Sequence, residues 1–466
     1  MKKSLKIFLM VLIPLMIFYG CKDRTELTGP KPISGKADFS SFVSIGNSLT
    51  AGYQSSALYE SSQLYSPGNL ISQQVNTKYV QPLISDPGIG GKIEVVSLDP
   101  FITKQEPSSG IPLNLTYAAP YNNLGIPGIV LADVMSAKTT DGSYSKSPFI
   151  DIILRNQGTT QFDQAKALHP TMITLWIGNN DVLGYATSGG FNPSEPTDPQ
   201  TFASLYNLLA DGLASTGAKV VVANIPEVSV IPFFTTVGPQ FANKINAAGI
   251  PQFYFQNHNF QPTVGTTSQL SDYTLLLTLI SQSYLAYFGH PSGKFYADHS
   301  IPPALFGIDT TKMFGLDPAN PIPNALILDA SEIQTCNQTT YQYNSTISSV
   351  VNRYPSQFAL VDINSVLNTV RSSDASGGTN FGGIYFKTTF VEGGLFSLDG
   401  VHPTSQGYAI IANEFLKVIN NKFDANYQLI DIANIPGSLS FGKTVSLNLF
   451  SKGSYLDPKI YEKILF

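Results

Sequence analysis

The chain of 466 residues contains few charged side chains, few histidines and only two cysteines. Asp, Glu, Lys and Arg make up 13%, about half of the ~25% found in an average globular domain. The net charge of −5 disfavours nucleic acid as the main partner, since nucleic-acid-binding surfaces are cationic. Cys21 and Cys336 form no CxxC pair, which argues against a disulfide scaffold and a cysteine-based zinc site. With 43% hydrophobic residues, the chain can still bury a large core.

The first twenty residues have the pattern of a secretory signal. The first six residues include three lysines, and an uncharged, mainly apolar run follows at 7–19. That run is shorter than the ~20 residues of a membrane-spanning helix but suits a signal-peptide core. Gly20-Cys21 then resembles a lipobox, in which Cys21 is diacylated and becomes the first residue of the mature protein; an uncleaved anchor is the alternative. We therefore predict a lipoprotein of the cell envelope, held to the outer membrane by its N-terminal lipid, on the periplasmic face or the cell surface.

Strand-like and helix-like patterns alternate along most of the chain. Continuous apolar runs are typical of strands buried on both faces, and they occur at 172–177, 219–223 and 358–363; residues 39–45 are rich in β-forming side chains. Helical patterns occupy 202–215 and 346–352, and another begins after Pro403. This alternation predicts an α/β fold with a parallel central sheet and helices on both faces.

One long segment interrupts this alternation. Residues 233–324 contain 15 Phe or Tyr but only seven charged side chains. We interpret the segment as a large aromatic-rich insertion, which is either extra core for a large domain or a cap that forms a substrate wall. Within it, residues 272–288 are predicted to form one apolar helix. The predicted order is a signal peptide (1–20), a flexible tether (21–37), a first domain part (38–232), the insertion (233–324), a second domain part (325–425) and a C-terminal tail (426–466).

The first motif that carries chemistry follows a predicted strand directly. Residues 46–53 place Ser48 between small residues at the carboxyl edge of the sheet, where open α/β sheets bind their ligands. If a helix follows, Ser48 also lies near its positive end, which favours a developing anion. Taken alone, the motif is an ordinary strand-to-helix turn.

Three further motifs supply the other groups that acyl transfer needs. A Gly-rich turn at 123–129 exposes the backbone N–H of Gly128, and Asn180 follows a predicted strand end. Asp399 and His402 are three residues apart, so the carboxylate can orient the imidazole and leave Nε2 free as a base. Each motif alone is a common turn or cap. Together they supply a nucleophile, an oriented base and oxyanion donors.

At these residues the sequence resembles the SGNH (GDSL-like) hydrolase family. The resemblance covers 39–231 and 324–423 and leaves 233–324 unexplained; Asn47 stands where the family's name has Asp. It implies a three-layer α/β/α sandwich with about five parallel strands in flavodoxin-like order. It also implies a catalytic Ser48, Asp399 and His402, and an oxyanion hole made by Ser48, Gly128 and Asn180. No metal and no cofactor are implied.

The resemblance implies hydrolysis of esters or thioesters. The aromatic insertion favours an apolar acyl substrate, so we expect a small-molecule or lipid ester as the partner. Three alternatives stay open: a carbohydrate O-acyl esterase, an acyltransferase on the same scaffold, and a non-catalytic surface binding lipoprotein. The sequence does not predict the oligomeric state.

Overall fold

The structure is a computed structural model that describes residues 33–98, 101–190 and 196–437. The predicted signal peptide, Cys21, most of the tether and residues 438–466 of the tail lie outside these ranges. Within them, no helix combines the length and apolar character that crossing a bilayer requires.

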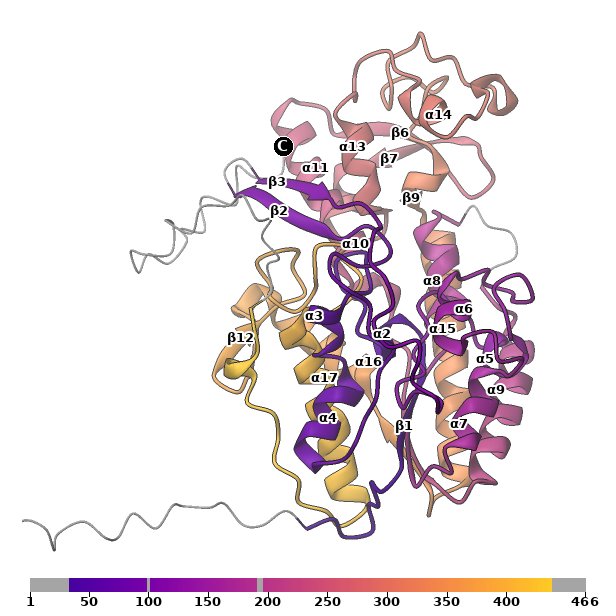
Figure 1. Ribbon diagram of the computed structural model, residues 1–466. Coiled ribbons are helices and arrows are strands. Elements are labelled where there is room, and N and C mark those ends of the chain that lie inside the picture. The colour runs from indigo at the N-terminus through magenta and orange to yellow at the C-terminus, as the bar shows by residue number, and fades with distance from the viewer. Residues whose placement is uncertain (1–32, 99–100, 191–195, 438–466) are drawn as a thin grey trace, which may run out of the picture.

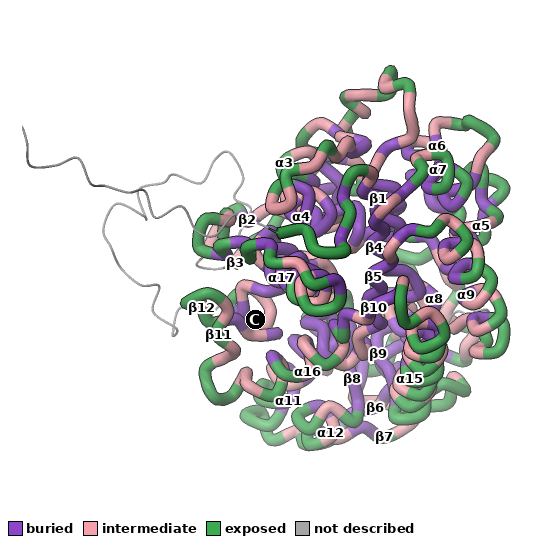
Figure 2. Tube along the Cα trace, turned by 90° about the horizontal axis from the view of Figure 1, so that it is seen from below, coloured by how far each residue is buried: buried purple, intermediate pink, exposed green. Residues whose placement is uncertain are grey.

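A parallel sheet of four strands forms the centre of the molecule. Its order is β1-β4-β5-β10, and every pair is parallel, as Figure 2 shows from below. All residues of the first two of these strands are buried, as expected of strands that are covered on both faces. The prediction of a parallel α/β sheet is confirmed, and the strands are β1 Phe42–Gly46, β4 Met172–Trp176, β5 Lys219–Ala223 and β10 Phe358–Val361.

The number of strands is lower than the expected five. Residues 122–126 lie along the free edge of β1, where Ser44 N–H donates to Asn122 O over 2.8 Å. Leu124 N–H donates back to Ser44 O over 2.9 Å. Only one parallel bridge, Ser44 to Asn123, forms there. The segment occupies the place of a fifth strand in flavodoxin-like order, but its Asn and Gly residues, and Pro127 directly after it, favour turns over strands.

Helices cover both faces of the sheet, which gives the expected three layers (Figure 1). On one side α4 packs against α17, and on the other α9 packs against α15. α15 is much longer than the predicted 346–352, because Asp329 and Glu332 form a capping box at its start. The bounds are α4 Pro67–Val75, α7 Gln161–Ala167, α9 Pro199–Ala214, α15 Ala330–Arg353, α16 Ile363–Ser373 and α17 Ser405–Lys422.

A second hydrophobic core lies beyond the carboxyl ends of the strands, at the top of Figure 1. It is built by residues between 237 and 327, whereas the larger core surrounds the central sheet. Its elements are α11 Val237–Ala247, β6 Gln252–Gln256, β7 Pro262–Thr266, α12 Thr267–Ser271, α13 Gln282–Leu285 and α14 Lys294–Asp298.

A short antiparallel pair connects the two cores. In β8 Leu276–Leu277 and β9 Ile327–Leu328, the partners Leu276 and Leu328 belong to the main core. Leu277 and Ile327 belong to the second core, as the alternation of side chains along a strand requires. The helix predicted over 272–288 is therefore wrong, since consecutive leucines here face opposite sides.

Candidate active site

Ser48 is the first residue of α2 Ser48–Ala51, directly beyond the carboxyl end of β1. The turn is tight: a Cβ on Gly46 would come within 2.3 Å of the Trp176 carbonyl oxygen on the neighbouring strand. Asn47 caps the helix, because its side-chain oxygen accepts the Leu49 N–H over 3.1 Å. These constraints fix Ser48 at the sheet edge, as the sequence predicted.

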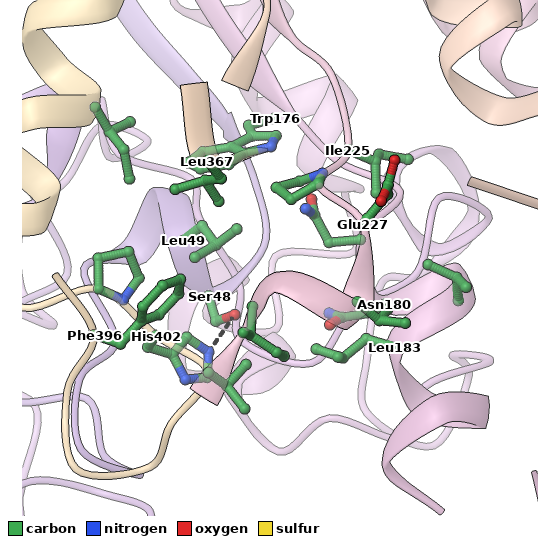
Figure 3. A pocket seen from close by; sticks show the side chains of 18 of the residues that line it. Ser48, Leu49, Trp176, Asn180, Leu183, Ile225, Glu227, Leu367, Phe396 and His402 are labelled. Atoms are coloured by element: carbon green, nitrogen blue, oxygen red, sulfur yellow. Dashed lines mark hydrogen bonds between the residues drawn. The ribbon is translucent and has the colours of Figure 1, made fainter. Parts of the chain in front are cut away.

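Ser48, His402 and Asp399 form one hydrogen-bonded chain. Ser48 Oγ and His402 Nε2 are 2.9 Å apart, as the dashed line in Figure 3 shows. His402 Nδ1 and Asp399 Oδ2 are 3.0 Å apart. Because a carboxylate only accepts, Nδ1 carries the proton and Nε2 is left to accept from the serine hydroxyl. The geometry matches that of a nucleophile, a base and its orienting carboxylate.

Asp399 is ionised although its side chain is only 8% exposed. Its Oδ1 accepts the backbone N–H groups of Val401 and His402 over 2.9 and 2.8 Å. Burial opposes its charge by desolvation, yet the charge and hydrogen bonds of His402 and the Val401 N–H hold the pKa of Asp399 below its ordinary value. The carboxylate therefore keeps His402 in one tautomer.

The other two motifs join the same sheet edge. Ile126 N–H donates to Gly46 O over 3.0 Å, which fixes the turn that carries Gly128 beside the end of β1. Asn180 begins α8 Asn180–Thr187 and donates one amide hydrogen to Ile129 O over 2.8 Å. Its second amide hydrogen remains available, and Figure 3 shows Asn180 beside the same pocket as Ser48.

Gly128 has a backbone conformation that suits glycine, with φ of +84°. Within the described ranges, neither Gly128 N–H nor Ser48 N–H donates to an acceptor. Both backbone N–H groups are thus available as hydrogen-bond donors.

The family model of the GDSL-like lipase/acylhydrolase family matches residues 42–261 and 269–415. The chain belongs to this family. Membership implies acylhydrolase activity of the esterase or lipase kind. The match also includes most of 233–324. The family resemblance therefore extends beyond 39–231 and 324–423, the ranges expected from the motifs. No curated protein sequence matches the chain.

An apolar pocket of about 70 Å³ adjoins Ser48 and His402 in this GDSL-like hydrolase (Figure 3). Side chains of the main domain line it, among them Leu49, Trp176, Leu183, Ile225, Leu367 and Phe396. Glu227 is its one carboxylate, counted over the described lining residues. None of these lining residues comes from 233–324. The segment therefore supplies no wall to this pocket.

The segment 233–324 instead contacts the loop that carries Asp399 and His402. Phe233 N–H donates to Gly400 O over 2.9 Å, in the loop between Asp399 and His402. Gly400 has φ of +70°, and a Cβ there would come within 3.0 Å of Phe233 N. The start of the segment therefore fixes the path of the Asp–His loop.

Sequence reasoning missed the turn after α2. Ser56 N–H donates to Asp399 Oδ2 over 2.8 Å, and Ser55 N–H donates to Ser397 Oγ over 2.9 Å. Ser397 Oγ in turn donates to Asp399 Oδ1 over 3.2 Å. Ser55 and Ser56 both have left-handed φ, 51° and 65°, a conformation that serine rarely adopts. The only sign of this turn in the sequence was the pair of small residues, Ser55 and Ser56, that follows Gly52.

Tyr53 was missed as well. Its ring lies 4.7 Å from the His402 ring, centroid to centroid, and its hydroxyl donates to Ser56 O over 2.6 Å. Burial and the nearby Asp399 charge raise the pKa of Tyr53, so the phenol stays neutral beside the imidazole. Within the described residues, no cluster of three or more His, Cys, Asp or Glu side chains could hold a metal ion.

Proposed function

We propose that the protein is a secreted, lipid-anchored serine esterase that cleaves carboxylic esters through an acyl-Ser48 intermediate. The observation that supports this most is the hydrogen-bonded chain from Ser48 through His402 to Asp399. It opens on an apolar pocket, as an acyl substrate would require.

In the proposed reaction, His402 Nε2 takes the proton of Ser48 Oγ as the oxygen attacks the acyl carbonyl carbon. The oxyanion that forms accepts hydrogen bonds from Ser48 N–H, Gly128 N–H and the Asn180 amide. When the intermediate collapses, the C–O bond to the alcohol breaks and His402 returns the proton to the leaving oxygen. Water then attacks the acyl-enzyme by the same route and releases the acid and free Ser48.

The pocket favours the acyl part of an ester over a charged group. The apolar side chains of Leu49, Leu183 and Leu367 on its wall can pack against an acyl chain. Trp176 contributes to its wall although its indole N–H donates to Asn224 O over 3.1 Å and only 3% of the residue is exposed. It is therefore a core residue with one face at the pocket.

The test uses purified residues 22–466 and p-nitrophenyl esters of increasing chain length. We expect hydrolysis of the short esters, covalent labelling by a fluorophosphonate, and a loss of ~10⁴-fold or more in kcat for Ser48→Ala. Ser204→Ala, on the exposed side of α9, is the matched control and should keep full activity. An unlabelled wild-type protein that is inert on a broad ester panel would refute the proposal.

Product analysis separates the hydrolase from its alternatives. Adding an acceptor alcohol yields a new ester if the protein is an acyltransferase, and acetylated sugars report a carbohydrate O-acyl esterase. Anchoring through Cys21 is tested by mass spectrometry of the protein from membranes. Acyl chains on an N-terminal Cys21 are expected, and a mature protein without them contradicts the anchor.

A further inference from the structure

Tyr53 lies in the turn directly after α2 and reaches every residue of the hydrogen-bonded chain at the active site. Its backbone N–H donates to Ser48 O over 3.1 Å, which ties it to the backbone of the nucleophile. Its ring lies 4.7 Å from the His402 ring between centroids, with 52° between the ring planes. Its hydroxyl donates to Ser56 O over 2.6 Å, and Ser56 N–H donates to Asp399 Oδ2 over 2.8 Å. One residue therefore adjoins the nucleophile, the base and the turn that binds the carboxylate.

Three neighbours hold Tyr53 itself in place. The hydroxyl of Tyr408, a fully buried residue of α17, donates to Tyr53 O over 2.5 Å. Phe149 packs edge-on against the Tyr53 ring, with centroids 6.1 Å apart and 86° between the planes. At the far end of the side chain, a Cβ on Gly90 would come within 2.6 Å of the Tyr53 hydroxyl oxygen. Because its backbone, ring and hydroxyl are each confined, Tyr53 offers the imidazole a fixed surface.

The contacts of Tyr53 go to catalytic groups of the protein and not to the pocket. The lining residues of the pocket beside Ser48, all within the described ranges, do not include Tyr53. Burial and the nearby Asp399 charge raise the pKa of Tyr53, so the phenol keeps its proton and takes no part in proton transfer. The χ2 torsion of a histidine has broad minima, so the tilt of the His402 ring depends on the groups packed against it.

We propose that Tyr53 is a positioning residue for ester hydrolysis, which sets the plane of the His402 imidazole with its ring and fixes the turn that binds Asp399 with its hydroxyl. This inference rests on the proposed esterase function. A general base must be aligned with the proton that it takes, and a displacement of about 1 Å can lower a rate by ~10²-fold. Because Tyr53 does not line the pocket, its replacement should lower kcat and leave KM nearly unchanged.

The test compares Tyr53→Phe and Tyr53→Leu with the wild type, each as the full mature chain, by steady-state hydrolysis of p-nitrophenyl acetate. Tyr53→Phe keeps the ring and loses one hydrogen bond, so kcat should fall roughly 2- to 10-fold. Tyr53→Leu loses the ring contact as well, so kcat should fall by ~10²-fold. In both variants KM should stay within about twofold of the wild-type value.

Tyr121→Phe is the matched control. Tyr121 is buried, its hydroxyl donates to Asn114 O over 2.9 Å, and it does not line the pocket. The control loses the same kind of hydrogen bond elsewhere in the protein, so it should keep the wild-type kcat even if its melting temperature falls. Kinetics are measured well below the melting temperature of every variant, so that lost stability is not mistaken for lost positioning.

A crystal structure of Tyr53→Leu tests the inference independently of turnover. The His402 ring is expected to adopt a second rotamer or to move away from Ser48 Oγ, which lies 2.9 Å from Nε2 in the intact site. An imidazole that keeps its place would overturn the proposal, as would a wild-type kcat in both Tyr53 variants or a rise in KM at constant kcat. A wild-type protein that is inert on esters would refute the esterase function instead, and the crystal structure alone would then decide whether Tyr53 positions His402.

Discussion

Ser56 donates its backbone N–H to Asp399 Oδ2 over 2.8 Å, and that same oxygen is 3.0 Å from His402 Nδ1. The turn that follows the serine helix thus binds the carboxylate from one side while the imidazole binds it from the other. Because 343 residues separate Ser56 from Asp399, only the folded chain can make this contact. The contact therefore fixes the position of the turn after α2 relative to the loop between Asp399 and His402.

Replacing Asp399 by Asn should lower kcat by ~10⁴-fold, because an amide can offer Nδ2–H to His402 and select the wrong tautomer. Since the pKa of Asp399 is held below its ordinary value, the wild type should lose this contribution only when the pH falls below the usual aspartate range of ~3.9. Steady-state kinetics at several pH values measure both effects. Near-normal kcat in the Asp399→Asn variant would contradict the assigned role of the carboxylate.

Two substitutions at Ser56 distinguish the role of its backbone N–H from the role of its side chain. Ser56→Gly suits a φ of 65° and keeps the N–H, so activity should be retained and the melting temperature unchanged or higher. Ser56→Pro removes the N–H and cannot adopt positive φ, so kcat should fall and the fold should weaken. The pair is compared by thermal denaturation and ester hydrolysis. Loss of activity in the glycine variant would show that the side chain matters instead.

Asn180→Ala removes the proposed oxyanion donor and should lower kcat by ~10²–10³-fold with little change in KM. The same change frees Ile129 O, so the melting temperature is recorded as well. Asn207→Ala is the control, since the Asn207 amide donates to Ala203 O within α9 over 2.7 Å. A large rise in KM at constant kcat would instead assign Asn180 to ground-state binding.

Glu332 should make the protein less stable as the pH rises. Burial raises its pKa to about 7, so the folded state binds its proton more tightly than the unfolded chain. Stability is then greatest below the unfolded pKa of ~4.3 and falls until the pH passes about 7, by about 4 kcal/mol at most.

Glu332→Gln should flatten that slope between pH 5 and 8. Urea denaturation followed by the fluorescence of Trp176, the only tryptophan, measures it. Asp329 lies in the same cluster, because its backbone N–H donates to Glu332 Oε2 over 2.7 Å. An unchanged slope in the Gln variant would place the titrating group elsewhere.

The sequence by itself determined the central strands and the four motifs. Continuous apolar runs are buried between two layers, so they specified β4, β5 and β10, and a segment rich in β-forming residues specified β1, without any tertiary information. Parallel strands end at one edge, so the polar residues after β1 and β4 had to meet there. The Asp399–His402 spacing predicted its own hydrogen bond because both residues share one turn.

Tertiary structure alone decided the rest. Ser55 and Ser56 adopt left-handed φ because Ser397 and Asp399, more than 300 residues away, accept their N–H groups. The leucines of β8 look helical in sequence but alternate between two cores. The local hydrophobic pattern of the sequence predicts which residues are buried. Which residues they contact depends on segments that are distant in the sequence.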